Sequence, residues 1–471
     1  MTSSLYWYDY ETFGLNPSRD HISQFAGIRT NEKLEIVSEP LVMYCHPPSH
    51  RLPSPESCLV TGITPQVCLT QGIPEREFID KIYRELSFPK TCGVGYNNIN
   101  FDDEFTRYCL YRNFYDPYAR EHQNGNSRWD ILNLLRLTRA LRPEGINWPV
   151  KDDGSPCFKL VSLTEANGID HESAHDALSD VIATINLAKL VMTKQPKLYN
   201  YIYAHRLKKE VKSLIDTDKK RPFLHVSGKL HKENLYSSLM MPLTINPTNN
   251  NSIICFNLMG DPKPLIDFSA TELYENLFVN KSNKQELSLY TIELNKCPII
   301  LTPKLIDDAA SNRLNISLEK CNKNLHELLK HDLSEKLKKA FFMCQFEKSK
   351  YLERSSHVCF IEAKYDQKNL KKVRNSSSTE LADITTDFQD KSYKALLFLY
   401  RATNYPDSLT VSEKKTWRNM RNERLNNDIE DPLSKRNYLL KINQLLSSKD
   451  CSERDRNILL SLKSWGDEIL N

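Results

Sequence analysis

The sequence predicts an α/β domain, a small β-rich domain and a C-terminal helical domain, in that order. Strand-like and helical stretches alternate up to residue 195, short β-like runs fill residues 223–303, and helical patterns return from Ile306 onward. A chain of 471 residues with 40% hydrophobic side chains can bury two or three separate cores. We therefore expect domains at 1–195, 196–345 and 346–471.

The first domain is expected to begin as an antiparallel sheet and to continue with helices. After three strand-like stretches comes a segment whose apolar residues have the three-and-four spacing of an amphipathic helix, with Pro74 in its first turn. A buried strand and three further helical stretches follow. The expected strands are 5–9, 23–29, 34–44 and 91–96, and the expected helices are 74–86, 101–113, 131–141 and 173–194.

The later domains differ in pattern. The β-like runs of the second domain are separated by Pro, Asn and Gly, whereas apolar residues at helical spacing mark the end of the chain. The segment 368–390 is polar and charged, so we expect a loop there. The expected strands are 223–226, 252–258, 289–293 and 298–301, and the clearest helices are 324–329 and 394–400.

Composition excludes several classes of protein. Mean hydropathy is −0.54, and no apolar run approaches the roughly 18 to 20 residues that cross a bilayer. The first nine residues have no basic leader followed by an apolar stretch, so we expect no secretion signal and a cytoplasmic location. No two of the 12 cysteines have the short spacing of a structural zinc site, which favours reduced thiols.

Charge is divided unevenly along the chain. Residues 1–195 carry 19 Lys and Arg against 25 Asp and Glu, which leaves 45 against 35 for the remainder. A basic excess is typical of a solvated surface and also of a surface that binds nucleic acid, and charge alone leaves both interpretations open.

Four carboxylates in three separate patches indicate a site for divalent metal ions. Asp9 and Glu11 end the first strand, where alternation turns both side chains to one face. Asp102 follows the buried strand at 91–96, and Asp180 lies in the last helix of the domain. Clustered carboxylates raise each other's pKa unless a cation lies between them. Mg²⁺ prefers such oxygen ligands, and two ions about 4 Å apart promote phosphodiester hydrolysis.

His175 completes the set as a candidate general base. It lies five residues before Asp180, a separation of about 140° around an ideal helix. If the helix opens at Ser173, the two side chains cannot bind one ion from a shared face. The imidazole would instead reach toward the attacking water, and a neutral imidazole near pH 7 accepts a proton well.

Each patch also has a purely structural interpretation. Asp-x-Glu at a strand end is common surface charge, and Asp102 begins an acidic first turn that a helix dipole favours. Ser173 and Asp176 are typical helix caps. The metal-site hypothesis depends on the order and context of all the patches together.

Beyond single residues, longer strings resemble the DEDDh exonuclease superfamily and, within it, the bacterial exodeoxyribonuclease I family. The superfamily's Asp-x-Glu-Thr matches residues 9–12, its second aspartate matches Asp102, and its His-x4-Asp matches residues 175–180. The closer resemblance rests on segments 9–14, 61–66, 95–98, 101–104, 111–118, 126–130 and 141–149, and continues through 225–228, 295–298 and, more loosely, 400–406.

The resemblance implies a ribonuclease H-like catalytic domain with a mixed sheet, an SH3-like β-barrel domain and a helical domain. It also implies processive 3′→5′ hydrolysis of single-stranded DNA to 5′-mononucleotides by a monomer that acts in DNA repair and uses two Mg²⁺ ions, or Mn²⁺. Asp9, Glu11 and Asp180 would hold the ion that activates water, Asp9 and Asp102 would position the second, and His175 would be the base.

Single-stranded DNA is the expected substrate, and the basic later domains would follow its phosphate backbone. Side chains near the motifs are candidate contacts, with aromatic rings stacking on bases and guanidinium groups meeting phosphates. Core packing is the alternative for the aromatic residues, most of all for Trp129. The candidate DNA-binding residues are Thr12, Phe13, Tyr96, Asn97, Phe101, Arg107, Arg112 and Arg128.

The family also binds the acidic, hydrophobic C-terminal tail of single-stranded DNA-binding protein. Such a tail requires a cation for its carboxylate beside an apolar pocket. Arg142, Tyr201 and Arg221 match positions of that pocket, although the family usually has Lys in place of Arg221, which changes the geometry of the contact.

Two alternative functions remain. A 3′ exoribonuclease or a proofreading exonuclease uses the same chemistry but usually needs only the first domain. A non-catalytic single-strand-binding module would keep the fold, yet all five catalytic positions are filled in this chain.

Overall fold

A computed structural model describes residues 3–171, 175–279, 285–344, 363–382, 384, 388, 392–427 and 433–469. The chain forms two compact units. The first combines Met1–Ser127, Glu172–Ile182 and Lys348–Asn471, and the second combines Arg128–His171 and Ala183–Glu347. The start and the end of the sequence therefore belong to one unit.

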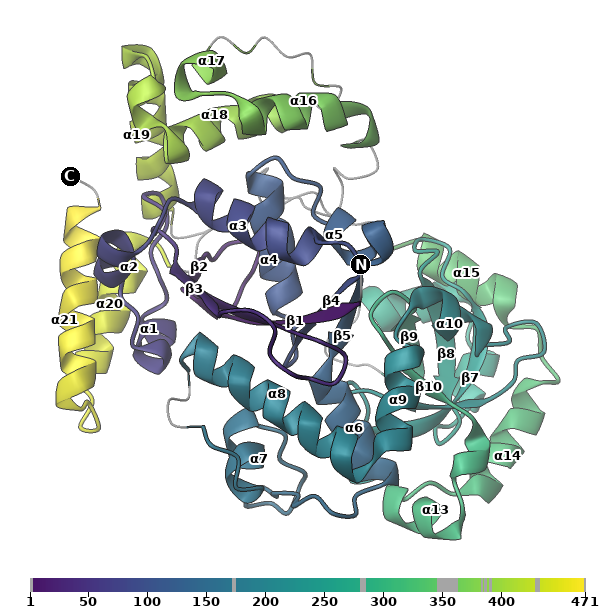
Figure 1. The fold of residues 1–471 in the computed structure, drawn as a ribbon. Coiled ribbons are helices and arrows are strands. Elements are labelled where there is room, and N and C mark those ends of the chain that lie inside the picture. The colour runs from purple at the N-terminus through teal and green to yellow at the C-terminus, as the bar shows by residue number, and fades with distance from the viewer. Residues whose placement is uncertain are drawn as a thin grey trace. The chain divides into compact units, whose positions relative to one another are not determined.

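A mixed sheet organises the beginning of the chain. Within the described residues its strand order is β3-β2-β1-β4-β5, and β1 is central to it (Figure 1). β1 pairs antiparallel with β2 and parallel with β4. The strands are β1 (Ser4–Thr12), β2 (Ile22–Thr30), β3 (Leu41–Tyr44), β4 (Thr91–Gly95) and β5 (Ser127–Asp130). Each predicted strand has a counterpart, but the strand expected at 34–44 is limited to β3 at Leu41–Tyr44, and β5 was not predicted.

The two faces of β1 have different roles. Tyr6, Tyr8 and Tyr10 are buried in an apolar core that also contains residues of α3 and α4. Asp9 and Glu11 alternate with these rings and so turn to the other face, which they share with the buried Leu5 and Trp7. A strand with an aromatic face anchors its carboxylates rigidly.

Short helices that sequence patterns missed lie beside the sheet. α1 and α2 each begin with proline after a capping Ser54 or Thr64, and seven residues are too few to show helical periodicity. The helices in this part of the chain are α1 (Pro55–Thr61), α2 (Pro65–Gln71), α3 (Glu75–Ser87), α4 (Asp102–Arg112), α5 (Ala119–His122), α6 (Ile131–Leu141), α7 (Leu160–Ala166) and α8 (Ala177–Lys194).

The second unit contains an antiparallel sheet with the order β10-β6-β7-β8-β9. β7 was not predicted, because Pro242 argues against a strand; the structure places this proline where the β7–β8 register shifts. The strands are β6 (Phe223–Val226), β7 (Ser237–Ile245), β8 (Ser252–Asn257), β9 (Leu289–Glu293) and β10 (Ile299–Leu301).

Along the sequence, helices precede the strands of this second sheet, lie between two of them and follow the last one. As predicted, the pattern becomes helical after Ile306. The helices are α9 (Pro196–Ala204), α10 (Lys208–Ser213), α11 (Lys263–Asp267), α12 (Ala270–Tyr274), α13 (Asp308–Leu314), α14 (Leu318–Leu328) and α15 (Ser334–Phe342).

The end of the chain is helical, and one prediction there was wrong. Residues 368–390 were expected to form a loop, but much of this segment lies in α16 and α17. Leu370, Val373 and Leu381 are buried against Phe114 and its neighbours, so a few apolar residues suffice to fix both helices. The helices are α16 (Ala363–Asn375), α17 (Ser378–Ala382), α18 (Ser392–Asn404), α19 (Val411–Asn426), α20 (Lys435–Leu446) and α21 (Glu453–Glu468).

The last helices share a core with the residue that follows β1. Phe13 is 4% exposed and belongs to an apolar cluster with residues of α1, α2, α20 and α21. Figure 1 shows α20 and α21 alongside α1 and α2. The C-terminal helices are therefore part of the support of the strand that carries Asp9 and Glu11.

Two compositional expectations can be compared with the structure. The cysteines in the described ranges are free thiols, as predicted. No helix among the described residues is long and apolar enough to cross a membrane.

Candidate active site

Asp9 and Glu11 form the first part of the site. Asp9 is half-buried and Glu11 is 7% exposed on β1. Their charges interact, since each carboxylate lies among others of the group. The predicted convergence of these two side chains on one face therefore agrees with the structure.

Asp102 is tied directly to β1. It is the first residue of α4 and is 2% exposed. Its Oδ1 accepts a hydrogen bond of 3.1 Å from the backbone N–H of Tyr10, which lies between the two β1 carboxylates. This bond holds the second patch against the first although 92 residues separate them in sequence.

A buried charged network lies behind these carboxylates. Asp103 is fully buried; the Tyr8 hydroxyl donates to it, and Arg120 Nη2 lies 2.5 Å from its Oδ1. Tyr8 precedes Asp9 in sequence and Asp103 follows Asp102. The network therefore fixes the spacing between β1 and α4, and with it the spacing of the two acids.

His175 and Asp180 reach the same place from a third segment. Glu11, His175 and Asp180 each offer a ligand atom, and these atoms lie within 4.8 Å of one another. Asp180 is in the first turn of α8. The structure thus brings together residues more than 160 positions apart.

The helical geometry predicted for His175 was wrong. α8 begins at Ala177, so His175 precedes the helix, and its backbone φ is 66°. A left-handed conformation is uncommon for a residue other than glycine and often marks a functional position. The argument from 140° on one helix does not apply, and Ser173 lies outside the described residues.

The pKa values of these acids indicate which kind of ligand suits the cluster. Burial, followed by the charges of Asp102, Glu11 and Asp180, raises the pKa of Asp9 well above its usual range. Burial and neighbouring acids likewise raise the pKa of Glu11 to about 9. Such carboxylates are neutral at pH 7 unless a cation compensates their charge. A set of buried acidic oxygens suits hard divalent ions.

Two residues that the sequence did not single out as site residues link β2 to this cluster. Gln24 is 2% exposed and lies opposite Glu11 in the β1–β2 register. Its Nε2 is 3.5 Å from Asp176 Oδ2, and its Oε1 is 3.3 Å from Ala177 N. Asp176 also caps α8 through Ser179 N, at 3.1 Å. The capping interpretation of Asp176 is thus correct, but a buried glutamine in a strand has no sequence signal.

The candidate DNA-binding residues near β1 and α4 divide into two groups. Thr12 is buried, with its hydroxyl 2.6 Å from Gly14 O, and Phe13 lies in the core described above. Tyr96, Asn97 and Phe101 are half-buried in the β4–α4 segment that leads to Asp102. Only this second group is partly accessible.

Arg107 and Arg112 were predicted as phosphate contacts, but both side chains are used inside the protein. Arg107 is 3% exposed, and its Nε and Nη2 lie 2.8 and 2.9 Å from the Glu121 carboxylate. Arg112 Nη2 lies 2.6 Å from Glu75 Oε1, and only 10% of its side chain is exposed. Burying an arginine requires such a partner, and the sequence does not show which arginines are buried.

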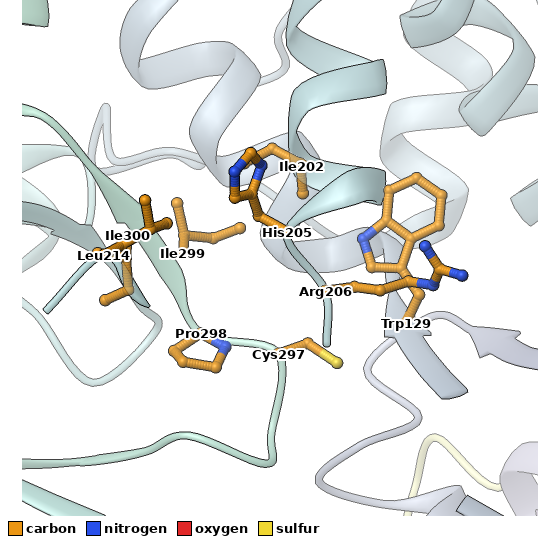
Figure 2. A pocket seen from close by; sticks show the side chains of 9 residues that line it. All are labelled: Trp129, Ile202, His205, Arg206, Leu214, Cys297, Pro298, Ile299 and Ile300. Atoms are coloured by element: carbon orange, nitrogen blue, oxygen red, sulfur yellow. The ribbon is translucent and has the colours of Figure 1, made fainter. Parts of the chain in front are cut away.

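Arg128 and Trp129 are also internal. Arg128 is 4% exposed, and its Nη2 donates to Asn295 O at 2.6 Å. Trp129 is 1% exposed and packs against the ring of Tyr199. Figure 2 shows Trp129 at the edge of a small pocket in the second unit, near Arg206. The core interpretation of Trp129 is confirmed.

The three candidate partner-binding residues all belong to the second unit. Arg142 is exposed beyond the end of α6 and donates to Leu141 O. Arg221 is exposed and pairs with Asp216 at 3.3 Å, and the half-buried Tyr201 ring stacks on His205. Their common role stays a prediction.

Family models cover most of the chain. One described as "Exonuclease" matches residues 6–188, "Exonuclease I SH3-like domain" matches 206–343, and "Exonuclease I C-terminal domain" matches 359–469. These matches confirm the predicted order of an exonuclease domain, an SH3-like domain and a C-terminal domain.

Complete proteins agree with the family models. The exodeoxyribonuclease I of Haemophilus influenzae is 43% identical over 429 residues, which are 90% of each chain. A zinc-bound structure of the Escherichia coli exonuclease I complex with single-stranded DNA has a TM-score of 0.94 and 37% identity, and covers both chains fully. A structure described as an "ExoI/SSB-Ct complex" has the same values.

Proposed function

The chain belongs to the exodeoxyribonuclease I family, and from this membership we propose that it degrades single-stranded DNA from the 3′ end, releasing 5′-mononucleotides processively. The observation that carries the proposal is the meeting of Glu11, His175 and Asp180 within 4.8 Å, where the charges of Asp9 and Asp102 also interact. This is the catalytic set of the superfamily's motif, assembled from three distant segments.

Divalent metal ions are the proposed cofactors, with Mg²⁺ as the physiological ion and Mn²⁺ as a substitute. Asp9, Glu11 and Asp180 would hold one ion, and Asp9 and Asp102 the second. When bound, the ions lower the pKa of a water molecule and stabilise charge on the phosphate oxygens. The raised pKa of Glu11, about 9, supports this assignment, because the acids are fully ionised at pH 7 only with a compensating cation.

His175 is the proposed general base. It is exposed on the turn before α8, so a water molecule at the scissile phosphate can reach its ring. It accepts the proton of the attacking water while the carboxylates stay with the metal ions. The partly accessible Tyr96, Asn97 and Phe101 are the best placed candidates to contact the terminal nucleotides.

The proposed partner is the acidic C-terminal tail of single-stranded DNA-binding protein, with Arg142, Tyr201 and Arg221 as its contacts. The exposure of both arginines and the solved ExoI/SSB-Ct complex support this assignment. Arg142→Ala should weaken binding of a synthetic tail peptide by about tenfold, the scale of a charged hydrogen bond, in fluorescence anisotropy. An unchanged affinity would exclude Arg142.

Domain boundaries near residues 195 and 345 are proposed as well. They fall between the ranges that the three family models match, which end at 188 and 343 and resume at 206 and 359. A DNA substrate also supports the cytoplasmic location and the DNA-repair role expected from the sequence.

A nuclease assay tests the proposed function. Labelled single-stranded DNA, duplex DNA and RNA are incubated with Mg²⁺ and then with chelator, using the parent and Asp9→Ala. We expect mononucleotides from single-stranded DNA only, with no release in chelator or from the variant. Equal cutting of RNA would indicate an exoribonuclease, and intact DNA would indicate a binding module. Glu39→Gln, an exposed acid outside the cluster, is the control.

A further inference from the structure

Gln24 occupies a position from which it can control the base of the proposed reaction. It lies on β2, directly opposite Glu11, and its side chain is buried. The segment that carries His175 comes from a distant part of the sequence. Something must therefore fix this segment against the sheet.

The Gln24 amide joins β2 to the segment that carries His175. Its Oε1 lies 3.3 Å from the N–H of Ala177, the first residue of α8, and its Nε2 lies 3.5 Å from Asp176 Oδ2 and 3.3 Å from the Tyr44 hydroxyl. Asp176 in turn caps the helix through Ser179 N. One side chain thus contacts both residues that follow His175.

The chemistry of this position favours an amide. The N–H of Ala177 requires an acceptor, while the Asp176 carboxylate requires a donor, and a glutamine offers both. A carboxylate would repel Asp176, and an apolar side chain would leave the buried N–H of Ala177 without its acceptor and the half-buried Asp176 without this donor.

The contact of Gln24 with Asp176 and Ala177 matters because it lies next to the turn that carries His175. His175 has φ 66°, a conformation that a histidine keeps only when its surroundings hold it. Displacing a catalytic group by about 1 Å can lower a rate by about 10²-fold. The bonds to Asp176 and Ala177 act directly beside this strained residue.

We propose that Gln24 is a positioning residue, whose amide holds the 175–177 segment against β2 so that the His175 ring faces the reacting water. This inference rests on the proposed function and names a second contribution to it. The side-chain contacts of Gln24 are with Tyr44, Asp176 and Ala177, so its proposed role is positioning and not catalysis.

A double-mutant cycle tests the inference. Gln24→Met should lower kcat by about 10- to 100-fold, with KM changed less than about twofold, in the parent. In the His175→Ala background the same change should cost less than about threefold, because no base remains to be positioned. Equal losses in both backgrounds would overturn the proposal. Gln66→Met, which removes an amide contact to Ser461 O away from the site, is the matched control.

An exchange of donor and acceptor provides the second test. Gln24→Glu should lower kcat, and adding Asp176→Asn should restore most of it, because the new Asn donates to the new Glu and still caps α8. Failure of this rescue in a folded double variant would contradict the proposed bond, even if Gln24→Met is too unstable to measure.

A readout independent of activity separates this inference from the proposed function. In protein with ¹³C-labelled histidine, Gln24→Met should shift or broaden the ring signal of His175, assigned from His175→Ala, and Gln66→Met should not. An inactive parent would refute the nuclease function alone, whereas an unperturbed His175 signal would refute the role of Gln24.

Discussion

The two sides of the active site are built differently. Asp9, Glu11 and Asp102 lie on a central strand and at the start of α4, joined by a backbone hydrogen bond and supported by a buried network. His175 lies on an exposed turn with a left-handed backbone, and the contacts from Gln24 reach the residues after it. The comparison indicates that the proposed metal ligands are fixed by the core, while the proposed base depends on a few local contacts.

The largest effect is expected on the rigid side. Asp102→Asn keeps an oxygen for the Tyr10 N–H but removes a negative charge from the metal site. We expect kcat to fall at least about 10⁴-fold, the scale for losing one member of a catalytic unit. Mn²⁺ binding, followed by electron paramagnetic resonance, should weaken in parallel. Normal metal binding with lost activity would show that Asp102 is not a ligand.

A variant of the proposed base should lose activity without losing metal binding. His175→Ala should lower kcat by about 10² to 10⁴, because only proton transfer is lost. Mn²⁺ binding should be largely retained, in contrast to Asp102→Asn. Loss of the metal would mean that His175 is a ligand, which its distance to Glu11 and Asp180 also permits.

The network behind the acids should affect stability more than chemistry. Asp103→Asn removes the closest charge partner of the buried Arg120 guanidinium and leaves only the more distant Glu121 carboxylate at 3.8 Å, which should cost about 3 kcal/mol of unfolding free energy. Urea denaturation, followed by fluorescence, would measure this loss of unfolding free energy. Asp216→Asn, at an exposed pair with Arg221, should cost less than about 1 kcal/mol. If both variants lose the same unfolding free energy, the buried network does not support the β1–α4 side of the site.

The last expected effect is a pH dependence that concerns only the metal-free protein. The pKa of Glu11 is about 9 in the folded state and 4.5 in its ordinary state. The folded protein therefore binds this proton more tightly, and its stability falls as pH rises between these values. In chelator, the Tm of the parent should therefore fall more than the Tm of Glu11→Gln as the pH rises through this range. If Tm depends on pH in the same way in both proteins, the pKa of Glu11 is not raised in the folded protein.

Much of this site could be predicted from sequence, for a physical reason. Asp9, Glu11 and Asp102 are fixed by local features, because strand alternation and a strand-to-helix junction determine where their side chains point. Asp180 was correctly placed in the last helix of the domain, although that helix begins at Ala177 and not at Ser173. A sequence motif reports local geometry, and the direction of these side chains depends on little besides that geometry.

The errors have a common cause in tertiary packing. His175 was assigned to a helix because nothing in its sequence indicates a left-handed turn, and that turn is stabilised from β2. Arg107 and Arg112 were assigned to DNA because a sequence does not show which cations find buried carboxylates. β7 was missed because its proline is tolerated only where the register shifts.

The position of Phe13 has a consequence for synthesis of the enzyme. The strand that carries the first two proposed metal ligands leads into a core completed by helices α20 and α21, which are synthesised long after it. A nascent chain that has not yet reached α20 lacks these packing partners. We therefore expect the active-site strand to gain its full support only once α20 and α21 have been made.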